Sequence, residues 1–508
     1  MGKKISELAA ASALDGTELV PVVQGGTTKR ATAADVLAYS QTAYPLVASF
    51  AWDTSTSSPA AVGGAVRKVT AIHAGMRRCV VNDAGVVQYY LLATDSTKKA
   101  DGSAANIDGT DGQVMVEIPR FYIKREVNGP IWTWSISAVP LTGYTVHPAF
   151  VKDGIEVPYR YYGAYDAALY TTKAITGITQ ANPAVVTCTG HGLVTGDVVT
   201  LSGIEGMVEL NGQTVTVTYV DADTFSIGVD STGYTAYSAG GAWAGILSGL
   251  NLDNASARYV AGSSKLASVS GKYPIVGLTR AQCRVAAANR GTIWRQLDFA
   301  LWSAVQLLYL IEYQSFYSQN ILGAGNTNGS YIASSSNQTD SPHTVAGASN
   351  ARGNGSTNVT TGAGASAKPG TSYMSYRGIE NFYGNAWNWA DGINVNVGSN
   401  GNVHVTNNRA DFADDTSTNM TLLTAEAPTS ANYASAIAAL DGYFVPTSVA
   451  GGSSSTYLTD YWYGSTSSNR VALVGGSADY GANAGAFCVA ATHGSSIRAR
   501  AIGARLAA

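Results

Sequence analysis

The stretch RGIENFYGNAWNWADGI, at residues 377–393, is the most informative part of this 508-residue chain. One residue separates Trp387 from Trp389, so an extended strand would place both indole rings on the same face. Large rings that share one face of a strand are typical of a buried core. The pattern therefore predicts a strand here, with both tryptophans packed inside.

Glycine-rich segments follow this stretch: GGS at 475–477, GANAGAF at 481–487 and IGARL at 502–506. The arrangement resembles the C-type-lectin-like domain of phage tail and adhesin proteins. That family overlaps the variable proteins diversified by retroelements and is related in fold to formylglycine-generating enzymes. The resemblance covers residues 46–173 and 248–508. It implies an α+β, β-rich fold class in which a C-type-lectin-like domain carries an inserted module and a short N-terminal segment.

Residues 174–247 form the expected insertion. Short runs rich in β-branched residues alternate with turns such as GHG at 190–192 and LNG at 210–212. This pattern predicts strands near 184–188, 197–201, 213–218 and 224–227, in a small all-β barrel or sandwich. The segment also resembles a β-module that recurs as an insert in phage tail proteins. His191 is expected to be a turn or packing residue rather than a ligand.

Residues 1–45 contain KISEL at 4–8, ELVPVV at 18–23 and TAADVL at 32–37. The second run is expected to be a strand and the third the start of a helix. A segment this small cannot bury a useful core, so it should be stable only against partners. It resembles the N-terminal anchor of phage tail fibres and spikes. That resemblance implies a location on the virion and contacts with other tail or baseplate proteins through residues 1–45.

Within the lectin-like part, residues 298–318 give the clearest helix signal. Leu301, Val305 and Leu308 fall on one line, and the helix is expected to cover one face of a sheet. Residues 163–169 suggest a second, short helix, and residues 86–92 and 114–118 suggest strands. The Gly-, Ser- and Asn-rich residues 323–370 should form long loops, either flexible or ordered over neighbouring subunits.

Composition narrows the classes of function. Charged residues make up 13% of the chain, about half the usual share, whereas Tyr occurs 29 times. Such a surface suits neutral hydrogen bonds and stacking contacts outside a cell, although an ordinary β-rich fold with many turns has a similar composition. A net charge of −3 with no basic run argues against nucleic-acid binding. The longest apolar run, residues 299–311, is too short for membrane insertion.

No catalytic, metal or cofactor site is expected. The cysteines at 79, 188, 283 and 488 are far apart and are expected to be buried apolar residues. Cys488 follows an apolar residue in a strand-like run, which argues against a reactive thiol. The calcium-linked triplets of sugar-binding lectins are absent, so calcium-dependent sugar chelation is not expected. Paired carboxylates for glycoside cleavage stay open, because their separation is spatial.

The resemblance also indicates where a binding surface would lie. In that family, framework residues hold a sheet and the side chains between them are displayed; here Gly475, Gly476, Gly485, Gly503 and Arg505 would be framework. The expected receptor-binding residues are Tyr461, Trp462, Tyr463, Ser477, Asp479, Tyr480, Asn483, His493, Ser495, Ser496 and Arg498. Tyrosine and tryptophan supply rigid stacking area, whereas Ser, Asn and Asp supply adaptable hydrogen bonds. The alternative is that these residues only complete a strand edge.

The leading hypothesis is a non-enzymatic phage receptor-binding protein. It would be a homotrimer, held on the virion outside the cell, that binds a host glycan or outer-membrane protein with an affinity multiplied by avidity. A polysaccharide-degrading tail enzyme and a structural tail or decoration subunit are the alternatives.

Overall fold

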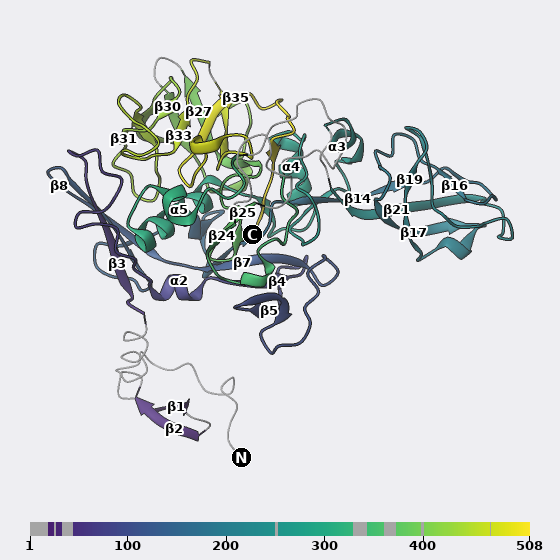
Figure 1. The fold of residues 1–508 in the computed structure, drawn as a ribbon, viewed down its shortest axis with the longest axis horizontal. Helices are drawn as coiled ribbons and strands as arrows, with labels where there is room; N and C mark the ends of the chain where they lie inside the picture. Colours follow the sequence, from purple (N-terminus) through teal and green to yellow (C-terminus); the bar gives the residue numbers. More distant parts are fainter. Residues whose placement is uncertain are drawn as a thin grey trace.

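The computed structural model describes residues 19–24, 27–32, 44–248, 252–328, 343–359, 372–397, 401–467 and 469–508. Strands predominate over helices and nearly all of them pair antiparallel, which confirms the β-rich character predicted from the sequence (Figure 1). Strand β1 (Leu19–Gln24) pairs with β2 (Thr27–Thr32), which confirms the strand expected at 18–23. Residues 33–43, which contain most of the expected helix start, lie outside the described residues.

Two sheets consist largely of residues before the insertion. The first has the strand order β10-β8-β9-β3, and the second has the order β23-β37-β13-β7-β4-β5-β6. Strands β5 and β7 confirm those expected at 86–92 and 114–118. The bounds are β3 (Val47–Asp53), β4 (Arg77–Val81), β5 (Val87–Leu92), β6 (Asp95–Lys99), β7 (Gln113–Pro119), β8 (Tyr122–Asn128), β9 (Ile131–Ser137), β10 (Thr145–Val146), β13 (Tyr159–Gly163), β23 (Arg295–Gln296) and β37 (Leu506–Ala507).

The C-terminal strand β37 lies inside the second sheet. Ala507 is opposite Tyr162 of β13 on one side and Arg295 of β23 on the other. Just before this strand, Arg505 forms a buried ion pair with Asp166 at 2.5 Å. Because the end of the chain is enclosed by its first part, residues on both sides of the insertion share one hydrophobic core. We call this unit, residues 44–173 and 248–508, the body.

The third large sheet contains the strand that carries Trp387 and Trp389. Its order is β29-β28-β27-β34-β35-β33-β30, with β36 parallel to β27. The side chains of Trp387 and Trp389 on β27 are 2% and 0% exposed, so the prediction that both belong to the core is confirmed. The bounds are β27 (Trp387–Val397), β28 (Gly401–Val405), β29 (Thr421–Ala427), β30 (Asn432–Tyr433), β33 (Tyr461–Tyr463), β34 (Arg470–Val474), β35 (Val489–His493) and β36 (Ile502–Gly503).

Helix α5 (Phe299–Tyr313) confirms the helix predicted at 298–318. Asp298 caps it by accepting a hydrogen bond from the Leu301 N–H at 2.8 Å. As predicted, the helix covers one face of a sheet, the one that contains β3 and β9, and β27 of another sheet also packs against it. Every residue from Phe299 to Glu312 is buried, because the helix packs against β3, β9 and β27 (Figure 1). Its apolar residues surround the helix instead of forming one stripe.

The short helix predicted at 163–169 is also wrong. Strand β13 ends at Gly163, and β14 (Ala168–Ala174) begins five residues later. Between them, the carboxylate of Asp166 accepts hydrogen bonds from Arg505, Asn385 and Asn388. These tertiary contacts hold the segment out of a helix, which local propensity alone would favour.

Smaller elements complete the body. Part of the segment 323–370 is ordered as β24, which pairs with β25; residues 329–342 and 360–371 lie outside the described residues. No helix in the described ranges is long and apolar enough to cross a bilayer. The bounds are α2 (Ala71–Gly75), α3 (Leu252–Arg258), α4 (Arg280–Ala288), α6 (Ser318–Leu322), β11 (Val151–Lys152), β12 (Ile155–Glu156), β22 (Lys265–Ala267), β24 (Thr357–Val359), β25 (Tyr373–Tyr376), β26 (Ile379–Glu380), β31 (Ala436–Ile437) and β32 (Pro446–Ser448).

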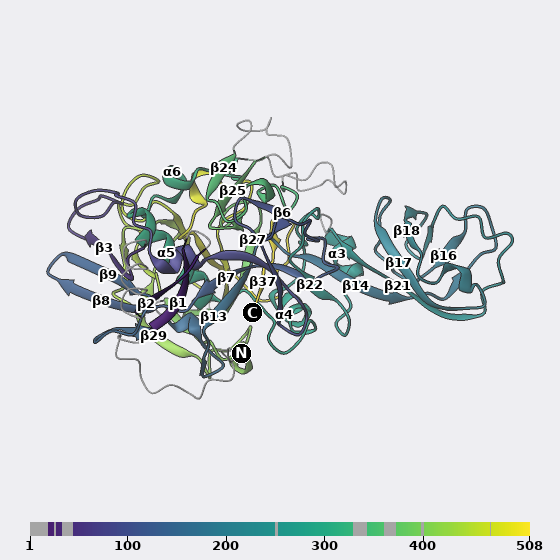
Figure 2. The same ribbon diagram turned by 90° about the horizontal axis from the view of Figure 1, so that it is seen from below.

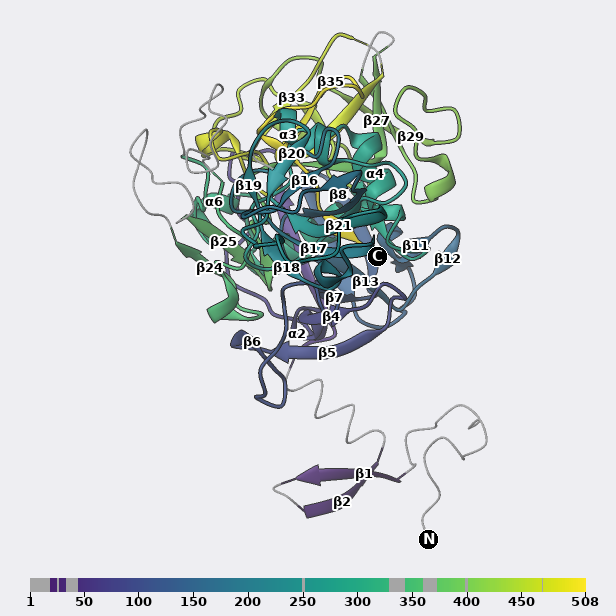
Figure 3. The ribbon, with the colours of Figure 1, turned by 90° about the vertical axis from the view of Figure 1, so that its right-hand side faces the viewer.

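Residues 174–247, which we call the arm, project from the body (Figures 1 and 2). Strands β14 and β21 (Ala239–Leu247) pair from Leu169 opposite Leu247 to Ala174 opposite Ala242, and they lead from the body into the arm. Figure 3 looks along this axis, with the strands of the arm in front of the body. The remaining strands are β15 (Gly177–Ile178), β16 (Val185–Thr187), β17 (Val198–Glu205), β18 (Thr214–Thr216), β19 (Thr218–Tyr219) and β20 (Thr224–Ser226).

The arm has a hydrophobic cluster of its own, in which Leu201, Phe225 and Trp243 are fully buried. The strands expected near 184–188, 197–201, 213–218 and 224–227 are confirmed. His191 is buried, and its Nδ1 accepts a hydrogen bond from the Leu193 N–H at 2.9 Å, which confirms its expected role in the turn. Because β14 runs from residue 168 to 174, the predicted boundary at 173/174 falls within a strand.

Candidate functional site

Strand β33 sets the direction of three predicted binding residues. Side chains alternate along a strand, so Tyr461 and Tyr463 lie on one side, with ring centroids 4.5 Å apart. Trp462 points to the other side, is 3% exposed, and donates its indole N–H to the Pro428 carbonyl at 2.7 Å. The prediction that Trp462 is displayed is therefore wrong, because the alternation that exposes its neighbours buries it.

Two further tyrosines extend this group. The ring of Tyr433, on β30, lies 5.0 Å from that of Tyr461 at an interplanar angle of 78°. The ring of Tyr480 lies 5.6 Å from that of Tyr463 at 79°. These are favourable edge-to-face contacts. All four tyrosines are partly exposed, as is Asn483, and we call these five residues the tyrosine surface.

Asn483 fixes two of the tyrosines. Its Oδ1 accepts a hydrogen bond from the Tyr433 hydroxyl at 2.6 Å, and its Nδ2 donates to the Tyr463 hydroxyl oxygen at 3.0 Å. Burial raises the pKa of both phenols, so they stay protonated at neutral pH. The Tyr463 proton has no acceptor within the described residues and is available to a bound molecule. The surface therefore combines stacking area with an oriented donor.

Buried residues hold the tyrosine surface from below. The ring of Trp387 lies 5.0 Å from that of Tyr480, at 83°. Gly485 also permits a close approach, because a Cβ there would collide with the carboxylate of Asp460. Gly475 and Gly476 adopt φ values of +91° and +85°, which side chains rarely tolerate. The backbone at these three positions therefore favours glycine.

Asp460 is a buried carboxyl group directly before the aromatic strand. It accepts hydrogen bonds from the Phe487 N–H at 2.8 Å and the Ser318 hydroxyl at 3.2 Å. In the described part of the chain it has no cationic partner. Burial, the largest influence, raises its pKa to about 8. At neutral pH the group is therefore mostly a neutral acid beneath the tyrosine surface.

Ser477 and Asp479 differ in exposure. Ser477 is 1% exposed, and its hydroxyl donates to the Asp479 carboxylate at 2.5 Å. Asp479 is exposed. The prediction that Ser477 is displayed is thus wrong, because its side chain turns inward and holds its neighbour.

The remaining predicted residues form a separate group after β35. Ser495 donates to Asp415 at 2.7 Å, and Arg498 donates to the Ser256 hydroxyl. Burial, followed by the charge of Arg470, lowers the pKa of His493. Ser496 and Arg498 are exposed. These contacts involve no residue of the tyrosine surface, so the predicted site divides into two groups.

Comparison with known proteins finds a similarity that is confined to the arm. The family model of the ubiquitin-activating enzyme E1 FCCH domain matches residues 181–245. The chain is 44% identical over 70 residues to ubiquitin-like modifier-activating enzyme 6 of Mus musculus and of Homo sapiens. It is 41% identical over 71 residues to ubiquitin-like modifier-activating enzyme 1 of Rattus norvegicus. The alignments cover 13% of this chain and 7% of each relative. The arm is similar to that domain.

The arm contains one cysteine, Cys188, and its environment disfavours a reactive thiolate. Cys188 is 1% exposed, and its sulfur accepts a hydrogen bond from the Trp243 indole N–H at 3.3 Å. Burial raises the pKa of its thiol, which disfavours the nucleophilic thiolate. All four cysteines are free and buried, which confirms their expected packing role. The described ranges contain no cluster of three or more His, Cys, Asp or Glu residues suited to a metal ion.

Sequence reasoning missed Tyr433. It lies about 30 positions before Tyr461 and comes from the two-residue strand β30, so no local periodicity marks it. Its place follows only from the pairing of β30 with β33, in which Tyr433 is opposite Tyr461. The one available signal was the high tyrosine content of the chain.

Proposed function

We propose that this protein is a receptor-binding protein of a phage tail and that it contacts a bacterial surface through the tyrosine surface. The observation that carries the proposal is the set of four partly exposed tyrosines in mutual ring contact, two of them fixed by Asn483. Side chains held in place before binding lose little conformational entropy when a partner arrives. Such a surface is suited to recognising a glycan or a protein receptor.

The proposal includes a C-type-lectin-like fold for the body. Its support is the resemblance of residues 377–393 and of the glycine-rich segments after 475. The antiparallel sheets and the enclosure of β37 between β13 and β23 are compatible with it. In this proposal residues 1–45 attach to tail or baseplate proteins. Three copies form a homotrimer, in which several weak receptor contacts give a higher overall avidity.

The arm would act as a spacer or a second adhesive surface. Arg258 at the end of α3 forms a buried ion pair with Asp197 at 2.5 Å and donates from Nε to the Gly192 carbonyl at 2.8 Å. Lys173 donates to the carbonyls of Gly190 and Ala257. These contacts join the root of the arm to the body and fix its direction.

The test is binding of the fluorescently labelled full-length protein to a panel of bacterial strains. Strains that bind it are retested after enzymatic deglycosylation, which distinguishes a glycan from a protein receptor. Tyr463→Ser should weaken binding at least tenfold, because a central aromatic contact is worth about 2 kcal/mol or more. Tyr159→Ser, at a 44% exposed tyrosine of the body outside the tyrosine surface, is the matched control. Unchanged binding by Tyr463→Ser would remove the tyrosine surface from the proposal.

A further inference from the structure

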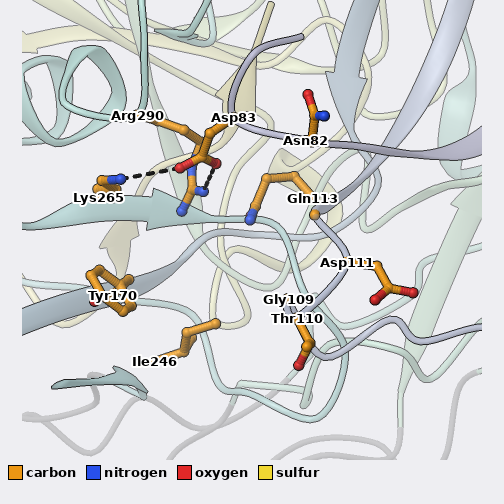
Figure 4. Close-up of a pocket in the computed structure, with 11 residues that line it drawn as sticks. Asn82, Asp83, Gly109, Thr110, Asp111, Gln113, Tyr170, Ile246, Lys265 and Arg290 are labelled. Atoms are coloured by element: carbon orange, nitrogen blue, oxygen red, sulfur yellow. Dashed lines mark hydrogen bonds and ion pairs between the residues drawn. The ribbon is translucent and has the colours of Figure 1, made fainter. Parts of the chain in front are cut away.

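A cavity of about 310 Å³ opens where the arm joins the body (Figure 4). Its walls include Tyr170 of β14, Lys265 of β22, Arg290 beyond α4, and Asp83, Asp111 and Gln113 from the first part of the body. We call it the junction pocket. Its volume lies near the lower end of the roughly 300–1,000 Å³ found for small-molecule sites, which suits one small ring.

The formal charges of the groups that line the junction pocket sum to zero. The Arg290 guanidinium is 7% exposed and pairs with Asp83 at 2.5 Å; the Lys265 ammonium pairs with the same carboxylate at 3.1 Å. Asp111 accepts a hydrogen bond from the Tyr89 hydroxyl at 2.8 Å. Two cations and two carboxylates leave no net formal charge. A ligand would therefore be selected by hydrogen bonding and shape rather than by charge.

Gln113 provides a buried donor with no partner. The side chain is 2% exposed, and its Oε1 accepts a hydrogen bond from the Ser268 N–H at 2.8 Å, which fixes the orientation of the amide. Figure 4 shows the amide nitrogen turned toward the space among the labelled residues. No acceptor for it occurs within the described residues. An oxygen atom of a bound molecule could therefore accept a hydrogen bond from this amide in place of water.

Tyr170 and Ile246 add an apolar wall. They are directly opposite each other on β14 and β21, and both are partly exposed at the pocket. The pocket thus presents an aromatic ring, a fixed amide donor and carboxylate acceptors around a small space. A sugar ring matches this set, because its hydroxyl groups both donate and accept hydrogen bonds while its C–H groups pack on apolar surfaces.

From this combination we infer that the junction pocket binds one uncharged sugar residue of a saccharide. The inference goes beyond the proposed function, because it uses no residue of the tyrosine surface. A neutral sugar is favoured over an acidic one because both cations already pair with Asp83.

The experiment titrates the full-length protein with glucose, galactose, mannose, N-acetylglucosamine and glucuronate, and follows binding by saturation-transfer NMR. At least one neutral sugar should bind, and more tightly than glucuronate. Tyr170→Ser removes the ring from a partly exposed position. Gln113→Glu keeps an acceptor for the Ser268 N–H but replaces the donor with an acceptor. Each variant should weaken sugar binding at least tenfold, whereas Tyr219→Ser in the arm should bind like the unmodified protein.

Three outcomes would overturn the inference, and a fourth would support it as a second site. If no neutral sugar binds, or glucuronate binds more tightly, the pocket does not have the proposed specificity. If Tyr170→Ser binds normally, the sugar lies elsewhere, and this readout remains valid even if Gln113→Glu fails to fold. If Tyr463→Ser alone abolishes binding, the sugar belongs to the tyrosine surface. Loss of cell binding by Tyr463→Ser with sugar binding retained would separate the two sites.

Discussion

The body and the arm both contain hydrophobic clusters and take part in buried ion pairs, but the two regions differ in how far apart in the chain their stabilising contacts lie. In the body, buried ion pairs join residues far apart in the chain, including Arg505 with Asp166 and Arg160 with Asp298. In the arm, a local cluster of apolar side chains such as Leu201 and Phe225 supplies the core. The body therefore depends on contacts that close long loops, whereas the arm depends on neighbours in the sequence. The comparison indicates that the arm can keep its structure when the body loosens.

Breaking the ion pair that closes the body should have the largest effect. Arg505→Ala leaves the Asp166 carboxylate buried without its cation, which should cost about 3–5 kcal/mol in the free energy of unfolding. Hydrogen exchange should show lost protection in β13 and β37 and retained protection in β17 and β20. Arg125→Ala, which breaks an exposed pair with Asp441, is the control and should cost at most about 1 kcal/mol. Equal loss in the arm would refute the independence of the two regions.

The reverse experiment destabilises the arm. Leu201→Ala removes a fully buried side chain and should lower the stability of the arm by about 3 kcal/mol, from lost burial and the cavity left behind. Exchange in β16, β17 and β20 should accelerate while β27 and β34 stay protected. The matched control is Val198→Ala, at the neighbouring 41% exposed position of the same strand. Faster exchange throughout the body would show that the two regions unfold as one unit.

Asp460 in the body and two exposed carboxylates in the arm should contribute to the pH dependence of stability with opposite sign. Asp460 in the body has a folded pKa of about 8, above its unfolded value of about 3.9. The folded state therefore keeps a proton that the unfolded state has lost, and the stability of the body should fall as pH rises toward 8, by at most about 1.4 kcal/mol per pH unit. In the arm, hydrogen bonds from Thr232 and Asp223 lower the pKa of Asp230 and Asp221, so stability should instead be lost in acid.

Denaturant titrations from about pH 2 to about pH 9 measure this difference, because that range includes both the ordinary aspartate pKa of about 3.9 and the raised pKa of Asp460. Asp460→Asn should flatten the pH dependence of the body and leave that of the arm unchanged. A profile for Asp460→Asn that matches the unmodified protein would mean that another group controls the response.

The sequence predicted the local structure of the arm better than that of the body. The strands of the arm were predictable because β-branched runs and turns lie next to each other, and His191 was correctly assigned to its turn. The burial of Trp387 and Trp389 was predictable from their spacing. Residues 163–169 were misassigned because Arg505, over 300 positions away, holds Asp166.

The candidate sites were less predictable. The inward positions of Trp462 and Ser477 depend on which side of β33 and of the turn after β34 faces the core, and the sequence does not specify this locally. The junction pocket draws its lining from six separate segments between residues 82 and 290, none of which carries a recognisable motif. The pairing of β14 with β21 and β22 brings Tyr170, Ile246 and Lys265 together. The pairing of β4 with β7 brings residues 82–83 next to Gln113, and the ion pair with Asp83 places Arg290 there.

The antiparallel pairing of β14 and β21 determines how the arm could be exchanged for another domain. Leu169 and Leu247 are directly opposite, so the points where the arm leaves and re-enters the body are one strand spacing apart, about 5 Å. Any unit whose own ends form an antiparallel pair could replace the arm without moving the strands on either side. The arm could therefore be replaced by a different inserted domain during evolution while the strands of the body keep their positions.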